Sequence, residues 1–414
     1  MKWSLGAGAI VAGVFLLAGC NGGTSSSPPL ASNPYQGLAT QSSDLALGTS
    51  TFVLPANVRR ACDETPREGY AECDALVRTD VGGPGAAVPG YGPSDLQSAY
   101  NLPSATKGAN QTIAIVDAYD DPNAETDLAT YRSNFGLPAC TTKNGCFQKL
   151  NQLGKPGPYP QPNQGWALEI SLDLDMVSAI CPKCHIMLVE SNDNFFNNLG
   201  SAVDRAARLG ANTISNSYSA KGNYRAGGAS IYYDHPGIII LVASGDTGYG
   251  PSIPGGYPST ISVGGTSLHK GGGTRGWTET VWGGTGSGCD THQAKPVWQT
   301  HRDCRGRIQN DVAAVADPST GVAVRDTYQA PGWIVVGGTS VATPLLAGVY
   351  GLAANERTLN VAQSLYTHKK DLYDITSGSN GTCTPPAGRA YLCTAEVGFD
   401  GPTGNGTPNG IGAF

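Results

Sequence analysis

The chain has 414 residues, of which 40% are hydrophobic and only 14% are charged, and its 26 basic and 32 acidic side chains leave a net charge of −6. A chain of this length and hydrophobic content can bury a large core, which excludes an intrinsically disordered protein. Because no block of lysine or arginine accompanies the low charge, the composition also excludes a nucleic-acid-binding protein.

The N-terminus has the pattern of an export signal. Lys2 is followed by an apolar run over residues 5–18, which is too short to span a bilayer. The run ends in Leu-Ala-Gly-Cys20, which resembles the lipobox of bacterial lipoproteins. We therefore expect residues 1–20 to form a lipoprotein signal region, in which cleavage before Cys20 leaves this residue as a lipid-modified N-terminus. An ordinary signal peptide is the alternative. We expect residues 21–90 to form a flexible tether or short propiece, and the protein to be lipid-anchored and extracytoplasmic in the bacterial cell envelope, or secreted.

Ten of the eleven cysteines, all except Cys20, lie close to another cysteine in the sequence. An oxidising compartment favours disulfides, and we predict them between sequence neighbours. The predicted pairs are Cys62–Cys73, Cys140–Cys146, Cys181–Cys184, Cys289–Cys304 and Cys383–Cys393. The Cys181-Pro-Lys-Cys184 segment could instead be a redox or zinc motif, but no second pair of ligands at metal spacing accompanies it, so we interpret it as structural.

From about residue 91, short apolar segments alternate with amphipathic ones. The predicted elements are strands at 113–116, 185–189, 213–217 and 237–243 and helices at 124–135 and 195–209. Such alternation indicates an α/β domain whose parallel sheet is covered by helices on both faces. Because the sequence shows neither an internal repeat nor a second boundary, we expect residues 91–414 to form a single domain.

Ser340 follows Gly337, Gly338 and Thr339 and precedes an apolar stretch that we predict to be a buried helix. A serine at the positive end of a helix is placed to act as a nucleophile, and nearby free backbone N–H groups could bind an oxyanion. A plain N-cap serine is the alternative. Such a nucleophile usually has a histidine base, but the His-Gly-Thr-His element of subtilisins is absent from this chain.

Three carboxylates could take the place of histidine. Glu169 and Asp173 are four residues apart, so on a helix they would share one face and could share a proton. The alternation of apolar and polar residues over 168–176 instead favours a strand, on which the two carboxylates would lie too far apart to interact. Asp246 follows the predicted strand 237–243, at the edge where parallel sheets hold their sites, although an aspartate in a glycine turn is the alternative.

In this order, the segments Glu169-x-x-x-Asp173, Ser-Gly-Asp246-x-Gly and Gly-Thr-Ser340-x-x-x-Pro resemble the sedolisin family, the serine-carboxyl peptidases. The resemblance covers most of residues 91–414 and implies a subtilisin-like α/β fold, a mostly parallel sheet flanked by helices in a single catalytic domain, with Glu169 and Asp173 on a helix. It implies that Ser340 is the nucleophile, Glu169 the base and Asp173 its orienting partner. Asp246 would help to form the oxyanion hole, and Asp117 would extend the carboxylate network.

The resemblance implies an endopeptidase that hydrolyses polypeptides at acidic pH. A carboxylate with a reference pKa near 4 still accepts a proton where an imidazole with a pKa near 6.5 is charged. The family also has a site for one Ca²⁺ ion with two aspartate side chains and three backbone carbonyls. In this chain it corresponds to Asp374, Ile375, Glu396, Gly398 and Asp400, with Glu396 where the family usually has glycine. We expect the protein to be a monomer.

Two departures from the family pattern leave alternatives open. Gly337 replaces a serine that often opens the last motif, and residues 21–90 are shorter than the family's usual folded propeptide. One alternative is a catalytically inactive sedolisin-like surface lipoprotein that binds peptides or a partner. The other is a neutral subtilisin-like protease that uses Asp117, a histidine and Ser340.

Overall fold

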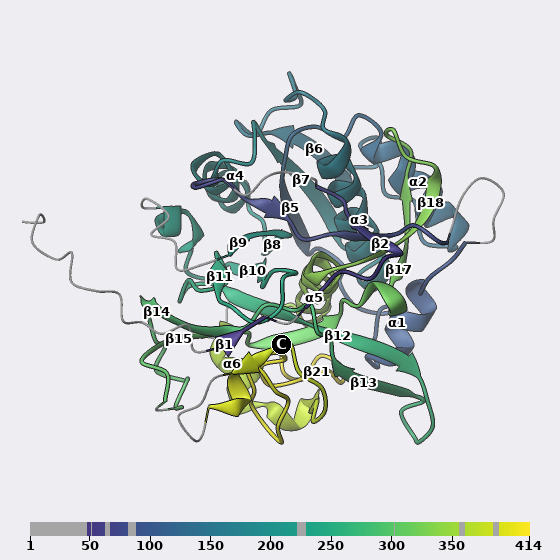
Figure 1. Cartoon of the computed structure of the whole chain (residues 1–414). Helices are drawn as coiled ribbons and strands as arrows, with labels where there is room; N and C mark the ends of the chain where they lie inside the picture. The colour runs from purple at the N-terminus through teal and green to yellow at the C-terminus, as the bar shows by residue number, and fades with distance from the viewer. Residues whose placement is uncertain are drawn as a thin grey trace, which may run out of the picture. The chain divides into compact units, whose positions relative to one another are not determined.

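In the computed structural model, the described parts of residues 48–414 fold around a central sheet (Figure 1). The described residues are 48–50, 52–62, 67–81, 88–221, 229–301, 303–355, 361–383 and 389–414. The expected signal peptide and Cys20 lie outside these residues. None of the described helices is long and apolar enough to cross a membrane.

The centre of the unit is an eight-stranded sheet. In spatial order its strands are β13 (Trp277–Val281), β12 (Ile261–Lys270), β10 (Ile239–Ala243), β8 (Thr213–Asn216), β5 (Thr112–Ala118), β7 (His185–Ser191) and β6 (Phe147–Asn151), and β16 (Val312–Val315) also pairs with β12. Every pairing is parallel except that of β12 with β13. The predicted parallel sheet is therefore confirmed, and its four predicted strands correspond to β5, β7, β8 and β10.

Helices cover this sheet (Figure 1). Helix α5 (Thr339–Ala353) contacts β8 and β10, and it packs against α3 (Gln164–Ile180), which contacts β5. Helix α4 (Phe196–Arg208) packs on β5 and β7. The remaining helices are α1 (Pro93–Ala99), α2 (Ala124–Asn134) and α6 (Val361–Thr367). The predicted helices at 124–135 and 195–209 are thus confirmed as α2 and α4.

Helix α3 occupies the segment whose alternation favoured a strand, so that interpretation is wrong. The helix begins after Asn163, whose side chain accepts hydrogen bonds from the N–H groups of Gly165 and Trp166. Every residue from Gly165 to Ile180 is buried. Because no face of the helix meets solvent, the sequence has no reason to show a helical period, and the alternation over 168–176 carries no information about structure.

Part of the expected tether is built into the domain. Strands β2 (Val58–Arg60) and β4 (Leu76–Arg78) pair with each other, and β4 continues the sheet to β18 (Gly332–Gly337) and β17 (Val322–Asp326). Strand β3 (Glu72–Cys73) pairs with β9 (Tyr218–Lys221), whose other neighbour is β11 (Ser252–Ile253). We call residues 67–78 the N-terminal strap. The described part of residues 21–90 thus differs from the flexible segment that we expected.

The other strands form small two-stranded sheets: β1 (Gly48–Thr49) with β20 (Thr382–Cys383), β14 (Gly288–Ala294) with β15 (Gly306–Gln309), and β19 (Leu372–Tyr373) with β21 (Thr407–Pro408). All five predicted disulfides are confirmed: Cys62–Cys73, Cys140–Cys146, Cys181–Cys184, Cys289–Cys304 and Cys383–Cys393. The Cys181-Pro-Lys-Cys184 segment is therefore a structural disulfide.

Candidate active site

Three neighbouring strands deliver polar residues to one edge of the central sheet. Asp117 lies near the end of β5, Ser217 follows β8, and Asp246 comes three residues after β10. Because parallel strands have their carboxyl ends at the same edge, these residues converge. Helices α3 and α5 bring Glu169 and Ser340 to the same place. The structure therefore assembles the predicted catalytic residues in one buried site.

Ser340 is the second residue of α5 and is fully buried. Its hydroxyl donates to the carbonyl oxygen of Ser217 at 3.2 Å, and its N–H donates to the carbonyl oxygen of Asp74 at 3.1 Å. The helix is preceded by Gly338, which has φ +106°, and a Cβ at this position would overlap Asp74 O and Asp246 Oδ2. Glycine is therefore required for the backbone to turn beside the nucleophile.

Glu169 and Asp173 lie on one face of α3, four residues apart, and both are fully buried. Asp173 Oδ1 accepts the hydroxyl of Ser217 at 2.8 Å, whereas neither carboxylate oxygen of Glu169 has a hydrogen-bond partner within the described part of the chain. Burial raises the pKa of Glu169 well above its usual value, the charge of Asp173 raises it further, and the nearby Ser340 hydroxyl acts to lower it. Burial likewise raises the pKa of Asp173.

Asp117 completes a group of three carboxyls. It is fully buried, and neither of its oxygens has a partner among the described residues. Burial raises the pKa of Asp117 to about 8, and its charge raises the pKa values of Glu169 and Asp173. Because close carboxylates cannot all ionise in an apolar site, the three carboxyls share protons and not all of them are charged at once.

Asp246 is positioned by the residue that precedes the nucleophile. Its Oδ1 accepts the N–H of Thr339 at 2.8 Å and the Thr339 hydroxyl at 2.9 Å, while Oδ2 has no partner among the described residues. Burial raises the pKa of Asp246 to about 7, although the Thr339 hydrogen bonds and the charge of Arg60 oppose the rise. Below that pH, Oδ2 can therefore carry a proton and act as a hydrogen-bond donor.

Three residues that contact this site were missed in the sequence analysis. Ser217 bonds both Asp173 and Ser340, and it follows β8 as Asp246 follows β10, so the strand-end rule could have found it. Thr339 lies inside the serine motif. The third residue, Asp74, belongs to the expected tether, and nothing in its local sequence indicates that it reaches the site.

The histidines lie elsewhere. All six are exposed or half-buried, whereas Ser340 is fully buried, and no hydrogen bond between described residues links a histidine to Ser340. These residues are His185, His235, His269, His292, His301 and His368. The described site thus lacks the histidine that a neutral subtilisin-like protease would require, and this alternative loses its support.

The residues expected to bind calcium lie near the C-terminus on two segments, 374–375 and 396–400, which a hydrogen bond joins. Gly398 donates its N–H to Asp374 Oδ2 at 2.9 Å, and Glu396 donates its N–H to Asp400 Oδ2 at 3.3 Å. Asp400 is fully buried; burial raises its pKa to about 7, and the charge of Asp374 contributes to this rise. Ile375 is buried beside Asp374. The carboxyl groups of Asp374 and Asp400 lie near each other, and carboxylate oxygens are ligands that suit a hard cation such as Ca²⁺.

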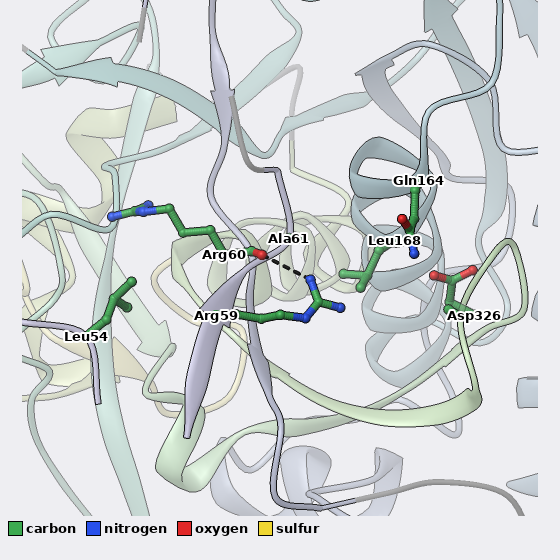
Figure 2. A pocket seen from close by; sticks show the side chains of 8 residues that line it. Leu54, Arg59, Arg60, Ala61, Gln164, Leu168 and Asp326 are labelled. Atoms are coloured by element: carbon green, nitrogen blue, oxygen red, sulfur yellow. Dashed lines mark hydrogen bonds between the residues drawn. The ribbon is translucent and has the colours of Figure 1, made fainter. Parts of the chain in front are cut away.

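A pocket of about 480 Å³ opens beside the site (Figure 2). Figure 2 shows Gln164 and Leu168 of α3 on one side of it and Arg59 and Arg60 of β2 on the other. The rest of its lining is Leu54, Ala61, Asp326 and Ala330. Because Leu168 directly precedes Glu169, the pocket offers space for side chains next to the helix that carries the carboxylate pair.

Residues 161–377, more than half of the chain, match the Subtilase family (Peptidase S8), and the chain belongs to this family. Within it the chain is a member of the sedolisin group, as the resemblance implied. It is 29% identical to kumamolisin of Bacillus sp. (strain MN-32) over 366 residues, which cover 79% of this chain and 63% of the relative. It is 24% identical to sedolisin of Pseudomonas sp. (strain 101) over 363 residues, which cover 77% and 60%. The matches thus span less than two thirds of these relatives' length.

A solved structure confirms the subtilisin-like fold. Pseudomonas sedolisin, described as a serine-carboxyl proteinase and complexed with two molecules of pseudo-iodotyrostatin, aligns with a TM-score of 0.64 and 24% sequence identity. The alignment covers 78% of this chain and 96% of that chain. The predicted subtilisin-like α/β fold class is therefore confirmed.

Proposed function

We propose that the protein is a serine-carboxyl endopeptidase that hydrolyses polypeptides at acidic pH through Ser340, Glu169, Asp173 and Asp246. The observation that carries this proposal is the meeting of a buried serine with a pair of buried carboxyls on α3, in a site whose described hydrogen bonds include no histidine. The raised pKa of Asp246, which keeps its neutral donor form below about pH 7, supports operation in acid.

In the proposed reaction, Ser340 Oγ attacks the carbonyl carbon of the substrate while its proton passes to Glu169. Asp173 accepts the Ser217 hydroxyl, orients Glu169 and shares a proton with it. The oxyanion accepts hydrogen bonds from the Ser340 N–H and from protonated Oδ2 of Asp246. The C–N bond then breaks and the leaving nitrogen takes the proton from Glu169. Water attacks the acyl-serine as Glu169 takes one of its protons, and that proton returns to Ser340 Oγ when the ester bond breaks.

Asp246 sets an upper pH limit in this scheme. Its folded-state pKa of about 7 lies above the usual value, so the neutral donor form predominates below pH 7 and is lost as pH rises through it. Activity should therefore decline through neutrality. Asp246 can be tested separately from the other site carboxyls. Thr339 holds only its Oδ1, so a substitution can change the atom at Oδ2 while these hydrogen bonds are kept.

Asp246→Asn should retain activity above pH 7, where the wild type loses it. The amide oxygen can accept from Thr339, and the amide nitrogen takes the place of Oδ2 as a donor that does not ionise. Asp246→Ala removes the donor and should lower kcat about 10²- to 10³-fold below pH 7, where the wild type has the neutral donor. The measurement is kcat against pH, from 3 to 8, on a peptide substrate. An unchanged decline in Asp246→Asn would show that another group governs it.

We also propose that Asp374 and Asp400, with the carbonyls of Ile375, Glu396 and Gly398, bind one Ca²⁺ ion. The uncompensated proximity of the two carboxyls supports this assignment. Bound calcium would supply positive charge that ties the C-terminal loop together. Among the described residues no group of three or more His, Cys, Asp or Glu side chains is placed to hold a metal, so backbone carbonyls would have to complete the shell.

Removal of calcium with a chelator should lower the Tm of protein purified in calcium by several degrees, because an ion that binds only the folded state adds about 2.7 kcal/mol at 100 times its Kd. Asp400→Asn keeps an oxygen for the hydrogen bonds from Thr403 and loses the charge. Its Tm should be lower and insensitive to the chelator. Identical melting of the wild type with and without chelator would contradict the proposed site.

We further propose that the protein is exported and carries a lipid on Cys20. The described disulfides support an oxidising compartment outside the cytoplasm. The lipobox-like segment before Cys20 supports attachment to the cell envelope.

A further inference from the structure

The pocket beside α3 is lined by two positive charges that the described part of the chain does not neutralise. The guanidinium of Arg59 donates to the carbonyl oxygen of Arg60 at 3.1 Å, and that of Arg60 donates to the carbonyl oxygen of Asp246 at 3.4 Å. Neither forms an ion pair with a described carboxylate. Figure 2 shows the Arg59 guanidinium directed toward Leu168, whereas Arg60 extends in the opposite direction. Arg59 is therefore the cation that faces the α3 side of the pocket.

A buried carboxyl with an unpartnered oxygen also lines this pocket. Asp326, the last residue of β17, is fully buried. Its Oδ1 accepts the N–H of Tyr328 at 2.8 Å, while Oδ2 has no hydrogen-bond partner among the described residues. Arg59 and Asp326 extend toward the pocket from opposite walls (Figure 2). Because buried polar atoms are normally hydrogen-bonded, Oδ2 is free to bond to a group that enters the pocket.

Asp326 is uncharged in acid. Burial raises its pKa to about 7, the charges of Asp121 and Asp127 add to this rise, and the charge of Arg325 opposes it. On α3, burial and the charges of Asp127 and Asp326 raise the pKa of Asp175 well above its usual value. Below pH 7 the neutral form of Asp326 therefore predominates, and its Oδ2 can donate a hydrogen bond. The two arginines then supply the net charge of the described lining.

These groups match a carboxylate on an apolar peptide segment. A guanidinium and a carboxyl O–H group both donate hydrogen bonds, and the two oxygens of a carboxylate can accept from both. The pocket also borders the first turn of α3, whose positive end attracts an anion. Leu54, Leu168 and Ala330 provide apolar walls beside the donors, and the volume of about 480 Å³ is that of a small-ligand site.

We propose that this pocket binds a carboxylate of the substrate's leaving fragment through the Arg59 guanidinium and the protonated carboxyl of Asp326. This inference rests on the proposed peptidase function and names a group that preferred substrates carry. Leu168 lines the pocket and directly precedes Glu169, which gives a proton to the leaving nitrogen in the proposed reaction, so the leaving fragment is the part of the substrate nearest to the pocket. Peptides offer such a carboxylate at a free C-terminus and on aspartate or glutamate side chains.

The test measures Kd by isothermal titration calorimetry at pH 5.5, on full-length Ser340→Ala, which lacks the proposed nucleophile. The probes are N-acetyl-alanyl-leucine, its C-terminal amide, and the C-terminal amide of N-acetyl-alanyl-glutamate. At this pH both kinds of carboxylate are charged, whereas Asp326 is neutral. We expect both charged probes to bind at least tenfold more tightly than the uncharged leucine amide. Tighter binding of the leucine acid than of the glutamate amide would identify the C-terminus as the preferred source, and the reverse order would identify the side chain.

Arg59→Gln, made in the Ser340→Ala protein, removes the cation. It should weaken binding of the charged probes about 10- to 100-fold and leave binding of the leucine amide unchanged, because hydrogen bonds between charged groups are the strong ones. Arg59→Lys keeps the charge without the two-pronged donor and should lie in between. Arg305→Gln is the matched control, since Arg305 is exposed and lies outside the pocket lining. Unchanged binding of the charged probes in Arg59→Gln would overturn the proposed site.

Asp326→Asn, in the same protein, tests the second donor. A rise from pH 5.5 to pH 8.5 should weaken binding of the charged probes at least tenfold, because Asp326 ionises and then repels a carboxylate. In Asp326→Asn the amide oxygen can accept from Tyr328, and the amide N–H group donates at both pH values. Its affinity should therefore change less than about threefold. An equal loss in both proteins would overturn the role of Asp326.

The outcomes separate this inference from the proposed function, which is measured as hydrolysis of acid-denatured serum albumin by the wild type. If the charged and uncharged probes bind equally while albumin is hydrolysed, the carboxylate site is wrong and the peptidase function stands. If the charged probes are preferred and Arg59→Gln removes the preference, the carboxylate site is supported. Failure to hydrolyse albumin would then overturn the peptidase function alone.

Discussion

Ser340→Ala is expected to lower kcat for peptide hydrolysis by at least ~10³-fold at pH 4. The substitution removes Ser340 Oγ, the proposed nucleophile at the second position of α5. It keeps the main-chain N–H of residue 340, which is one of the proposed oxyanion donors. The measurement is the rate of fragment release from acid-denatured albumin, with circular dichroism to verify folding. Ser364→Ala is a matched control, because this buried serine in α6 bonds the carbonyl oxygen of Ala413 and should affect only stability.

Equal rates for Ser340→Ala and wild type would show that Ser340 is not the nucleophile. If both proteins are folded but neither hydrolyses peptides, while both bind them, the inactive peptide-binding lipoprotein becomes the better description. A loss confined to Ser340→Ala supports the peptidase function and excludes that alternative.

Glu169→Gln should lower kcat by about 10²- to 10⁴-fold, because an amide cannot accept the proton that leaves the serine. The substitution preserves the size of the side chain and removes a carboxyl that has no hydrogen-bond partner within the described residues, so we expect the fold to be retained. No choice of pH should restore the rate. The measurement is kcat over pH 3–7 with the same substrate as for Ser340→Ala.

Asp175→Asn is the control for Glu169→Gln. It lies on the same helix and is equally buried, but it faces away from the site and accepts the N–H of Arg325 at 2.8 Å. Its kcat should stay within a few-fold of wild type. A similar loss in both variants would mean that general damage to α3, rather than loss of a base, explains the effect.

The predicted strands and amphipathic helices agree with the structure where one face meets solvent or where a short apolar run lies between turns. Helix α4 shows this, because its polar residues alternate with buried ones at a helical period. The same reasoning fails for α3, which is buried on all sides, so that its assignment as a helix came only from the family resemblance. Periodicity reports the boundary between core and solvent, and a wholly internal helix has no such boundary.

The residues of the candidate site likewise divide into those that the sequence predicts and those that it does not. Asp246 and Ser217 could be found from their positions just after parallel strands, and Ser340 from the glycines before a buried helix. The position of Asp74 could not be predicted, because it depends on a strap that pairs with strands more than a hundred residues away. Such long-range pairing has no local sequence signal, and the strap's turn-rich surroundings resemble a linker.

If the site hydrolyses proteins as proposed, the antiparallel pairing of β3 with β9 limits which proteins can be its substrates. A chain that replaces the strap must expose consecutive main-chain amides and carbonyls in extended form, as β3 does. Helices and the inner strands of sheets have already used those groups, so intact globular proteins present nothing for β9 to hold. The substrates of the proposed peptidase are therefore unfolded chains, and acidic conditions would supply them by denaturing proteins.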